Sequence, residues 1–123
     1  MIKFRAWDKF YECMINPAGI ELENGEVAHI IEQLPGETTK SSITYYELMQ
    51  STGLKDKNGM EIFEGDVLKG PMDFGPAGYV ESVAPVNYHK IDGYQLHYFL
   101  LEHTEVIGNV YEDKNIKFGP VEE

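Results

Sequence analysis

The chain has 123 residues, with 21 acidic and 10 basic side chains and a formal net charge of −11. This length predicts one domain, 1–123, and the apolar content of 42% argues against global disorder. The charge disfavours direct nucleic-acid binding, because affinity for a polyanion comes largely from Lys and Arg. No apolar run approaches the roughly 20 residues of a membrane helix.

Period-two alternation of apolar residues, bounded by turn residues, predicts short β-strands along the whole chain. The aromatic content of 12% favours the same class. The predicted strands are 2–7, 10–15, 20–22, 27–31, 43–50, 60–63, 67–69, 79–83, 86–91, 94–101 and 105–111. The segment 43–50 is also compatible with a short helix.

Turn residues separate these strands. Asn24-Gly25 and Asp92-Gly93 suit the positive φ angles of two-residue hairpins. The segments 56–59 and 64–66 supply turns on either side of the short strand at 60–63. Gly108 interrupts the last strand, where a bulge or a close backbone approach fits. Residues 117–123 are expected to fray.

Two segments have no strand or helix pattern. Residues 34–42 are polar, and residues 70–78 contain two prolines and three glycines. Proline removes a backbone donor and glycine weakens a strand, so we expect two long loops, the first of them mobile. Loops on a rigid scaffold often form binding surfaces, which makes 34–42 and 70–78 candidate binding segments.

Three blocks of the sequence carry a resemblance to a known family. They are MIKFRAWDK at 1–9, LMQSTGLKDKNGMEIFEGDVLK at 48–69 and EVIGNVYE at 105–112. In their order and spacing they resemble the YopX family, small bacteriophage and prophage proteins whose molecular function is not established. The resemblance implies a mostly β, small-barrel body encoded by a phage or prophage gene, and it transfers no catalytic residue.

The sequence departs from this family outside the three blocks. The segments 10–46 and 70–104 match nothing in it, and 113–115 reads Asp-Lys-Asn where a family member is expected to turn through Asn-Pro. We expect any functional specialisation in these segments. The layout predicted for the single domain is an N-terminal β-hairpin region at 1–47, a barrel-like region at 48–112 and a tail at 113–123. The N-terminal hairpins either extend the barrel sheet or form a separate lobe.

The fold class predicted is mainly β, with a β-rich α+β fold as the alternative. A strand entered through Gly65-Asp66 resembles the way in which small SH3-like barrels begin a strand, so the body is expected to be an SH3-like barrel type. This expectation rests on analogy of fold and implies no activity.

The sequence shows no convincing metal, cofactor or catalytic motif. The histidines have no metal-ligand spacing, although His89 and His97 flank the expected Asp92-Gly93 turn and are neighbours across that hairpin. The segment 56–61 superficially resembles a calcium loop but lacks its alternating oxygen ligands. Its residues are those of an ordinary hairpin turn. We therefore predict no metal and no cofactor. The other histidines are His29 and His103.

Catalytic groups are equally hard to assign. Glu61, Glu64 and Asp66 are conceivable as an acid–base pair, but the glycine and apolar positions around them already explain the segment as structure. Cys13, the single cysteine, excludes an internal disulfide and is expected to be a small packing residue, since no neighbour in sequence lowers its pKa. We predict that the protein is not an enzyme.

The aromatic residues are expected mostly in the core. Trp7 is predicted to be buried because of its size, although alternation places it opposite Ile2, Phe4 and Ala6. Most of the eight tyrosines are likewise expected to be core or half-buried strand residues. In the predicted strand 94–101, apolar residues occupy both faces, which favours a central strand or a homo-oligomer.

These observations favour a cytoplasmic phage or prophage accessory protein in a bacterial host, acting as a non-enzymatic protein-interaction module. The partner expected is a host or phage protein, and no membrane segment is expected. A nucleic-acid-associated accessory protein, or an acidic mimic of DNA, is the alternative. An enzyme of unknown reaction is the third candidate.

Overall fold

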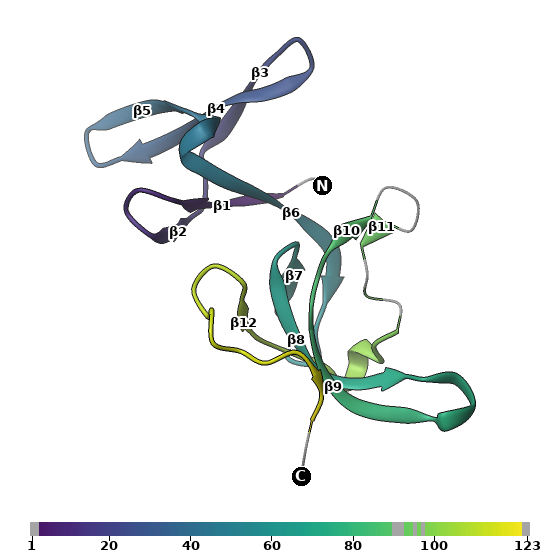
Figure 1. Cartoon of the computed structure of the whole chain (residues 1–123). Coiled ribbons are helices and arrows are strands. Elements are labelled where there is room, and N and C mark those ends of the chain that lie inside the picture. Colours follow the sequence, from purple (N-terminus) through teal and green to yellow (C-terminus); the bar gives the residue numbers. More distant parts are fainter. Residues whose placement is uncertain (1–2, 90–92, 95, 97, 122–123) are drawn as a thin grey trace. The chain divides into compact units, whose positions relative to one another are not determined.

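The structure is a computed structural model that describes residues 3–89, 93–94, 96 and 98–121 (Figure 1). The chain divides into two compact units, Ile2–Gln50 and Ser51–Glu123, each considered by itself below. Strands dominate both, and the helical segments of the described residues are three short 3-10 helices. The mainly β class is therefore confirmed. No helix in the described part of the chain is long and apolar enough to cross a membrane.

The unit Ile2–Gln50 is built from antiparallel hairpins. One hairpin pairs β1 with β2, and β1 also pairs with the first half of β6. The other strands form a three-stranded sheet in the order β3-β4-β5, followed by the 3-10 helix η1. The bounds are β1 Phe4–Asp8, β2 Cys13–Ile15, β3 Gly19–Glu23, β4 Glu26–Leu34, β5 Glu37–Ser42, η1 Ile43–Tyr45 and β6 Tyr46–Lys55.

The core of this unit is small. Ala6, Ile30 and Tyr46 are buried at its centre. Their partly buried apolar neighbours are Ile15, Ile20, Val27, Ile43 and Leu48. These positions come from β1 to β4, η1 and β6, so each hairpin contributes one apolar face to a common centre, as alternation along a strand requires.

Two turns of the unit Ile2–Gln50 test the hairpin predictions. Asn24 and Gly25 have φ angles of 52° and 81°, and Glu23 pairs with Glu26, so the predicted two-residue turn is confirmed. The expected loop at 34–42 is wrong. Leu34 pairs directly with Glu37 across Pro35-Gly36, and Glu37–Ser42 is the strand β5. Proline followed by a glycine with φ of 79° suits a tight turn, and Thr38 and Thr39 favour a strand despite their polarity.

The first hairpin is shorter than expected. The strand predicted at 10–15 begins only at Cys13, and Lys9–Glu12 is a four-residue turn. Asp8 explains the difference, because its Oδ1 accepts hydrogen bonds from the backbone N–H groups of Phe10 (2.9 Å) and Tyr11 (3.0 Å). Such a side-chain bond stabilises a turn in place of a continuing strand. The strand expected from 43 likewise starts at Tyr46, after η1.

The unit Ser51–Glu123 contains a curled, half-barrel sheet of four strands in the order β12-β8-β9-β13 (Figure 1). The short strand β7 pairs with the second half of β6, and β10 pairs with β11. Two 3-10 helices lie between strands. The bounds are β7 Glu61–Phe63, β8 Asp66–Asp73, η2 Gly75–Ala77, β9 Tyr79–Pro85, β10 Tyr88–His89, β11 Gly93–Tyr94, η3 Leu101–His103, β12 Glu105–Asn109 and β13 Gly119–Pro120.

The core of this unit lies on one face of the curled sheet. Its buried residues are Ile62, Leu68, Val86, Leu96 and Phe99. Met72, Ala84 and Val106, from β8, β9 and β12, are among the partly buried residues that pack on it. The predicted turns at 56–59 and 64–66 are confirmed, with Gly59 and Gly65 at φ of 79° and 88°. An SH3-like barrel is compatible with this sheet but stays a prediction.

The expected loop at 70–78 is also wrong for its first half. Gly70 and Pro71 belong to β8, and the connection to β9 is only Phe74–Gly78, which includes η2. Pro71 fits within the strand because β12 pairs with β8 only as far as Lys69, so a missing N–H breaks no ladder bond there. Gly70 is required by packing, since a Cβ at this position would lie 2.8 Å from the Cα of Thr104.

The C-terminal part of the chain differs from the expectations in two places. The strand predicted at 94–101 is wrong, because β11 ends at Tyr94 and η3 begins at Leu101. Its two apolar faces therefore give no argument for a homo-oligomer. The tail is paired over 119–121 and not frayed there, because β13 pairs with β9 and the N–H of Val121 donates to Glu81 O at 2.8 Å. The Asp92-Gly93 turn lies partly outside the described residues, since Asp92 is not described.

The bulge predicted at Gly108 is confirmed, and the group that approaches this glycine closely is a side chain, not backbone. The register between β12 and β8 shifts between Val106 and Gly108, which is a β-bulge. A Cβ on Gly108 would also lie 2.8 Å from Cγ of Asp113. The chain has Asp113 where a family member is expected to turn through Asn-Pro. Oδ2 of Asp113 accepts a hydrogen bond from the N–H of Asn109 at 3.1 Å, which stabilises this turn locally.

Candidate functional site

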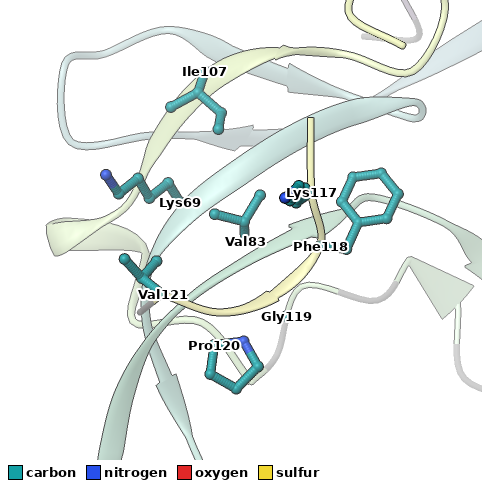
Figure 2. Close-up of a pocket in the computed structure, with 8 residues that line it drawn as sticks. All are labelled: Lys69, Val83, Ile107, Lys117, Phe118, Gly119, Pro120 and Val121. Atoms are coloured by element: carbon teal, nitrogen blue, oxygen red, sulfur yellow. The ribbon is translucent and has the colours of Figure 1, made fainter. Parts of the chain in front are cut away.

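A hollow of about 430 Å³ lies on the sheet of Ser51–Glu123. Its floor follows from strand register. Lys69, Val83 and Gly119 are cross-strand neighbours on β8, β9 and β13, and Gly119 brings no side chain to fill the space. Figure 2 shows Val83 between Lys69 and Lys117. The remaining lining residues are Ile107, Phe118, Pro120 and Val121.

This hollow is poorly equipped for catalysis. Its lining includes two lysines but no carboxylate, imidazole or thiol side chain. General acid–base and nucleophilic catalysis depend on such groups held close to one another. We call it the lysine hollow and consider it below as a surface for an anionic ligand.

A second hollow, of about 190 Å³, lies in the unit Ile2–Gln50 and is bordered by exposed aromatic rings. Phe10, Tyr11 and Tyr45 are 77%, 75% and 58% exposed, and we call these three residues the aromatic patch. Asp8, Ser41 and Tyr46 complete the lining. Single exposed apolar side chains are common on protein surfaces and need no explanation. Several exposed aromatic rings around one hollow form a contiguous apolar patch, and such patches usually mark interaction surfaces.

The local sequence fixes the aromatic patch in place. The two Asp8 bonds hold the backbone of Phe10 and Tyr11, and Glu12 closes the turn with a φ of 52°. The rings of Phe10 and Tyr11 meet edge to face, with centroids 4.8 Å apart. The N–H of Lys9 donates to Tyr45 O at 3.0 Å, which connects this turn to η1. The rings are therefore presented on hydrogen-bonded backbone.

Carboxylates give this region a negative field. Glu32 accepts a hydrogen bond from the hydroxyl of Tyr46 at 2.9 Å. Burial, and after it the carboxylates of Glu32 and Asp8, raise the pKa of Tyr46, against a hydrogen bond with Ser41 that lowers it. Partial desolvation, together with Asp8 and Glu32, also raises the pKa of Cys13.

Cys13 and Trp7 differ from their predicted burial. Cys13 is exposed, so it is not the packing residue that we expected. A raised pKa reduces the fraction of Cys13 that is present as thiolate. Trp7 is half-buried, short of the full burial that its size suggested.

The tyrosines also correct the sequence prediction. Only Tyr46 is in the core, and Tyr94 and Tyr111 are half-buried. The remaining five, all more than half exposed, are Tyr11, Tyr45, Tyr79, Tyr88 and Tyr98. Four of these lie in turns, short hairpins or 3-10 segments, where period-two alternation does not determine burial.

One group of side chains has the composition of a metal site. Ligand atoms of Glu21, Glu23 and His29 lie within 4.8 Å of one another on β3 and β4. However, Lys40 Nζ lies 3.3 Å from both carboxylate oxygens of Glu21, and His29 Nδ1 lies 3.1 Å from one of them. Glu21 already has a cationic neighbour, so this group is an exposed ion-pair cluster. His103 is exposed on η3, and the expected proximity of His89 and His97 lies outside the described residues.

The segment that resembles a calcium loop has a structural role. Asp56 is buried, and its Oδ1 accepts the N–H groups of Asn58 and Met60, both at 2.9 Å. Its Oδ2 accepts the N–H of Val106, also at 2.9 Å. Burial alone raises the pKa of Asp56, but these three bonds outweigh it and hold the pKa below its ordinary value. Both oxygens of the carboxylate are therefore used by the backbone.

The three acidic residues considered for acid–base chemistry do not share a site. Asp66 is buried, and its Oδ2 accepts the N–H of Phe63 at 2.7 Å. Burial raises the pKa of Glu64, which is half-buried in the turn before β8. Glu61 is on β7, and no described hollow is lined by two of the three.

The aromatic patch is the feature that sequence reasoning missed. We expected Phe10 and Tyr11 within a strand, where alternation would bury one of them. The available signal was Asp8, two and three residues before them, because an Asp side chain commonly bonds to backbone N–H groups at that spacing. Its effect on the hairpin could not be read from alternation alone.

Comparisons with known proteins agree with the fold. The chain is similar to a protein of known structure, EF1440 from Enterococcus faecalis, at 29% identity and a TM-score of 0.64. The match covers 94% of this chain and 96% of that protein. No curated protein matches the sequence. The model of the family described as YopX protein matches residues 3–116, nearly the whole chain, and the chain therefore belongs to the YopX family.

Proposed function

We propose that the protein is a phage- or prophage-encoded accessory protein that acts in the cytoplasm of a bacterial host as a non-enzymatic protein-interaction module. The observation that supports a protein partner is the aromatic patch, Phe10, Tyr11 and Tyr45. Tyrosine and other aromatic residues are enriched at protein interfaces, where they bury a large area at low conformational cost. All three rings are mostly exposed, so we expect the stability of the fold to depend little on them.

The patch replaces the segments 34–42 and 70–78 as the expected binding surface. Most of those residues are paired in hairpins, so they offer fewer free backbone groups than loops would. The turn at Lys9–Glu12 is shorter, but it carries two adjacent aromatic side chains on a backbone that Asp8 holds by hydrogen bonds. A fixed surface binds with less loss of conformational freedom than a mobile one.

A nucleic-acid-associated protein is the second candidate, and the lysine hollow is what favours it. Lys69, Lys117 and the exposed ring of Phe118 line one hollow, and single-stranded nucleic acid is bound by just such a combination of cations and stacking rings. Against it, Glu105 is the cross-strand neighbour of Lys69, and the net charge of −11 repels phosphate. A DNA mimic and an enzyme have weaker support, since no described group of side chains points to either.

The proposal is tested by isolating the partner and rebuilding the complex. The tagged chain is cross-linked in bacteria that carry the phage or prophage, and a recovered protein is then produced separately and mixed with the pure chain. We expect a complex of fixed stoichiometry in sedimentation velocity. Failure of every recovered protein to form such a complex, together with micromolar binding to DNA and a steep salt dependence, would favour the second candidate instead.

A further inference from the structure

The aromatic patch has accessible ring faces. Phe10 and Tyr11 pack edge to face at an interplanar angle of 86°, an arrangement that leaves ring faces open to solvent, and both rings are about three-quarters exposed. The face of an aromatic ring carries the negative part of its quadrupole and attracts ammonium and guanidinium groups. The rings therefore favour a cationic ligand over an anionic one.

The charged groups around the patch also favour a cationic ligand. Glu12 lies in the turn itself, Asp8 lines the hollow, and Glu47 is beside Lys9. Lys9 is the one cation in this turn, and its Nζ lies 3.4 Å from the Glu47 carboxylate, so its charge is already opposed. The raised pKa values of Cys13 and Tyr46 agree with a negative potential here, because Asp8 and Glu32 contribute to both after desolvation.

We propose that the aromatic patch is the docking surface for a cationic segment of the protein partner, in which Arg or Lys side chains lie over the rings of Phe10, Tyr11 and Tyr45 and approach the carboxylates of Glu12 and Glu47. This inference rests on the proposed function and gives its partner a chemical class. Arginine fits better than lysine, because its planar guanidinium stacks on a ring and its hydration is weaker. A purely apolar segment would supply no positive charge for the carboxylate of Glu12, whereas Glu47 is already beside Lys9.

The probe is a capped tri-arginine peptide, compared with its tri-citrulline counterpart, which has nearly the same shape and no charge. Binding is measured from amide chemical shifts of the full chain at low salt. We expect weak binding of tri-arginine, no measurable binding of tri-citrulline, and loss of binding at high salt. The Phe10→Ala/Tyr11→Ala variant is expected to bind tri-arginine about tenfold more weakly, as removal of two exposed cation–ring contacts implies.

A matched control is available at the hairpin between β8 and β9. Phe74 and Tyr79 are 45% and 59% exposed, so the Phe74→Ala/Tyr79→Ala variant removes a similar pair of rings from another surface. Its affinity for tri-arginine is expected to stay within about twofold of the wild type, well inside the effect of one cation–ring contact. Tyr45→Ala is a second variant of the patch and applies if the turn variant does not fold.

The charged part of the surface has its own pair of variants. Glu12→Gln is expected to weaken tri-arginine binding, while Glu102→Gln, an exposed carboxylate on η3, is expected to leave it unchanged. Equal losses from the patch and control variants would show that the peptide responds only to net charge and would overturn the inference. So would tri-citrulline binding as tightly as tri-arginine.

The failures of the two proposals are distinguishable. A purified partner that binds the Phe10→Ala/Tyr11→Ala variant as tightly as the wild type would overturn the docking surface and leave the interaction module intact. Localised tri-arginine binding at the patch, with no protein that forms a complex, would support the cation preference and count against the proposed function.

Discussion

The units Ile2–Gln50 and Ser51–Glu123 are held together in different ways. In the first, neighbouring segments pair through short turns, as in β3, β4 and β5. In the second, segments far apart in the sequence are connected by buried polar groups. Asp56 accepts the N–H of Val106, and Lys57 donates to Thr104 O at 2.9 Å. Most strands of the first unit pair with a neighbour in sequence through a short turn, and the pairing of β1 with β6 is the exception. The second unit depends more on contacts between distant segments, which form only when the sheet is in place.

Among the substitutions that test this comparison, we expect the largest loss of stability where Gly70 packs against Thr104. Thr104 is fully buried, and a Cβ on Gly70 would lie 2.8 Å from its Cα, which cannot move without shifting the backbone. Gly70→Val is expected to lower the free energy of unfolding by about 3 kcal/mol, the upper part of the range for overpacking. Denaturant unfolding measures the change.

Gly19→Ala is the matched control in the other unit. Gly19 is also in a strand, but a Cβ there would be 3.6 Å from Ile31 Cδ1, an ordinary contact. Its effect is expected to stay below about 1 kcal/mol. If Gly70→Val and Gly19→Ala cost the same, the close approach of β8 to Thr104 has no energetic importance.

The next effect comes from Asp56. In Asp56→Asn the side chain keeps one acceptor oxygen and gains an NH₂ group that faces a backbone donor. At least one buried N–H then loses its partner, which is expected to cost about 2 kcal/mol in denaturant unfolding. Glu102→Gln, at an exposed carboxylate on η3, serves as a comparison for the loss of one negative charge.

Asp56 also predicts a dependence on pH. The pKa of the folded state is below that of the unfolded state, so the contribution of Asp56 is present above the unfolded value of about 3.9 and disappears as pH falls through the lower folded value. The difference in stability between wild type and Asp56→Asn should therefore shrink on acidification below about pH 4. A difference that stays constant down to pH 2 would contradict the role assigned to this carboxylate.

A smaller effect is expected from a turn glycine. Gly59 has a φ of 79°, and a Cβ there would meet no atom within 4 Å, so only backbone strain opposes substitution. Gly59→Val should lower the free energy of unfolding by about 1–2 kcal/mol, because a β-branched residue is disfavoured at positive φ. An unchanged melting temperature would count against this turn conformation.

The smallest effect on stability is expected at the aromatic patch. Phe10→Ser/Tyr11→Ser removes two rings that are mostly exposed, while the Asp8 bonds to the backbone remain. The free energy of unfolding should change by less than about 0.5 kcal/mol. A loss of several times that amount would show that the rings belong to the folding core and weaken the case for a binding surface.

Structure was predicted correctly from the sequence where a few adjacent residues determine it. The mainly β class, the Asn24-Gly25 turn, the turns at 56–59 and 64–66, and the Gly108 bulge all follow from a few adjacent residues. Prediction failed where a local side-chain bond such as that of Asp8 was overlooked, and also where distant residues decide. Gly70 pairs with Ser82 within β8, where the distant Thr104 leaves no room for a Cβ, and β13 is placed by its pairing with β9.

The candidate site was less predictable than the fold. Neither alternation nor apolarity indicates that Phe10 and Tyr11 are exposed, because apolar residues are normally predicted to be buried. The Asp8 side chain decides the matter by ending β1, and the approach of Tyr45 depends on how η1 packs beside that turn. Composition showed only that the net charge is negative, which disfavours nucleic acid and other anionic ligands.

The most direct test of the account compares the two hollows in one experiment. Amide shifts of the isotope-labelled chain are recorded with tri-arginine at low salt and, separately, with a single-stranded DNA oligomer at physiological salt. The account predicts changes confined to Lys9–Cys13 and Tyr45–Glu47 with the peptide, and no changes around Lys69, Lys117 and Phe118 with DNA. Changes around the lysine hollow with DNA, and none at the aromatic patch with the peptide, would contradict it.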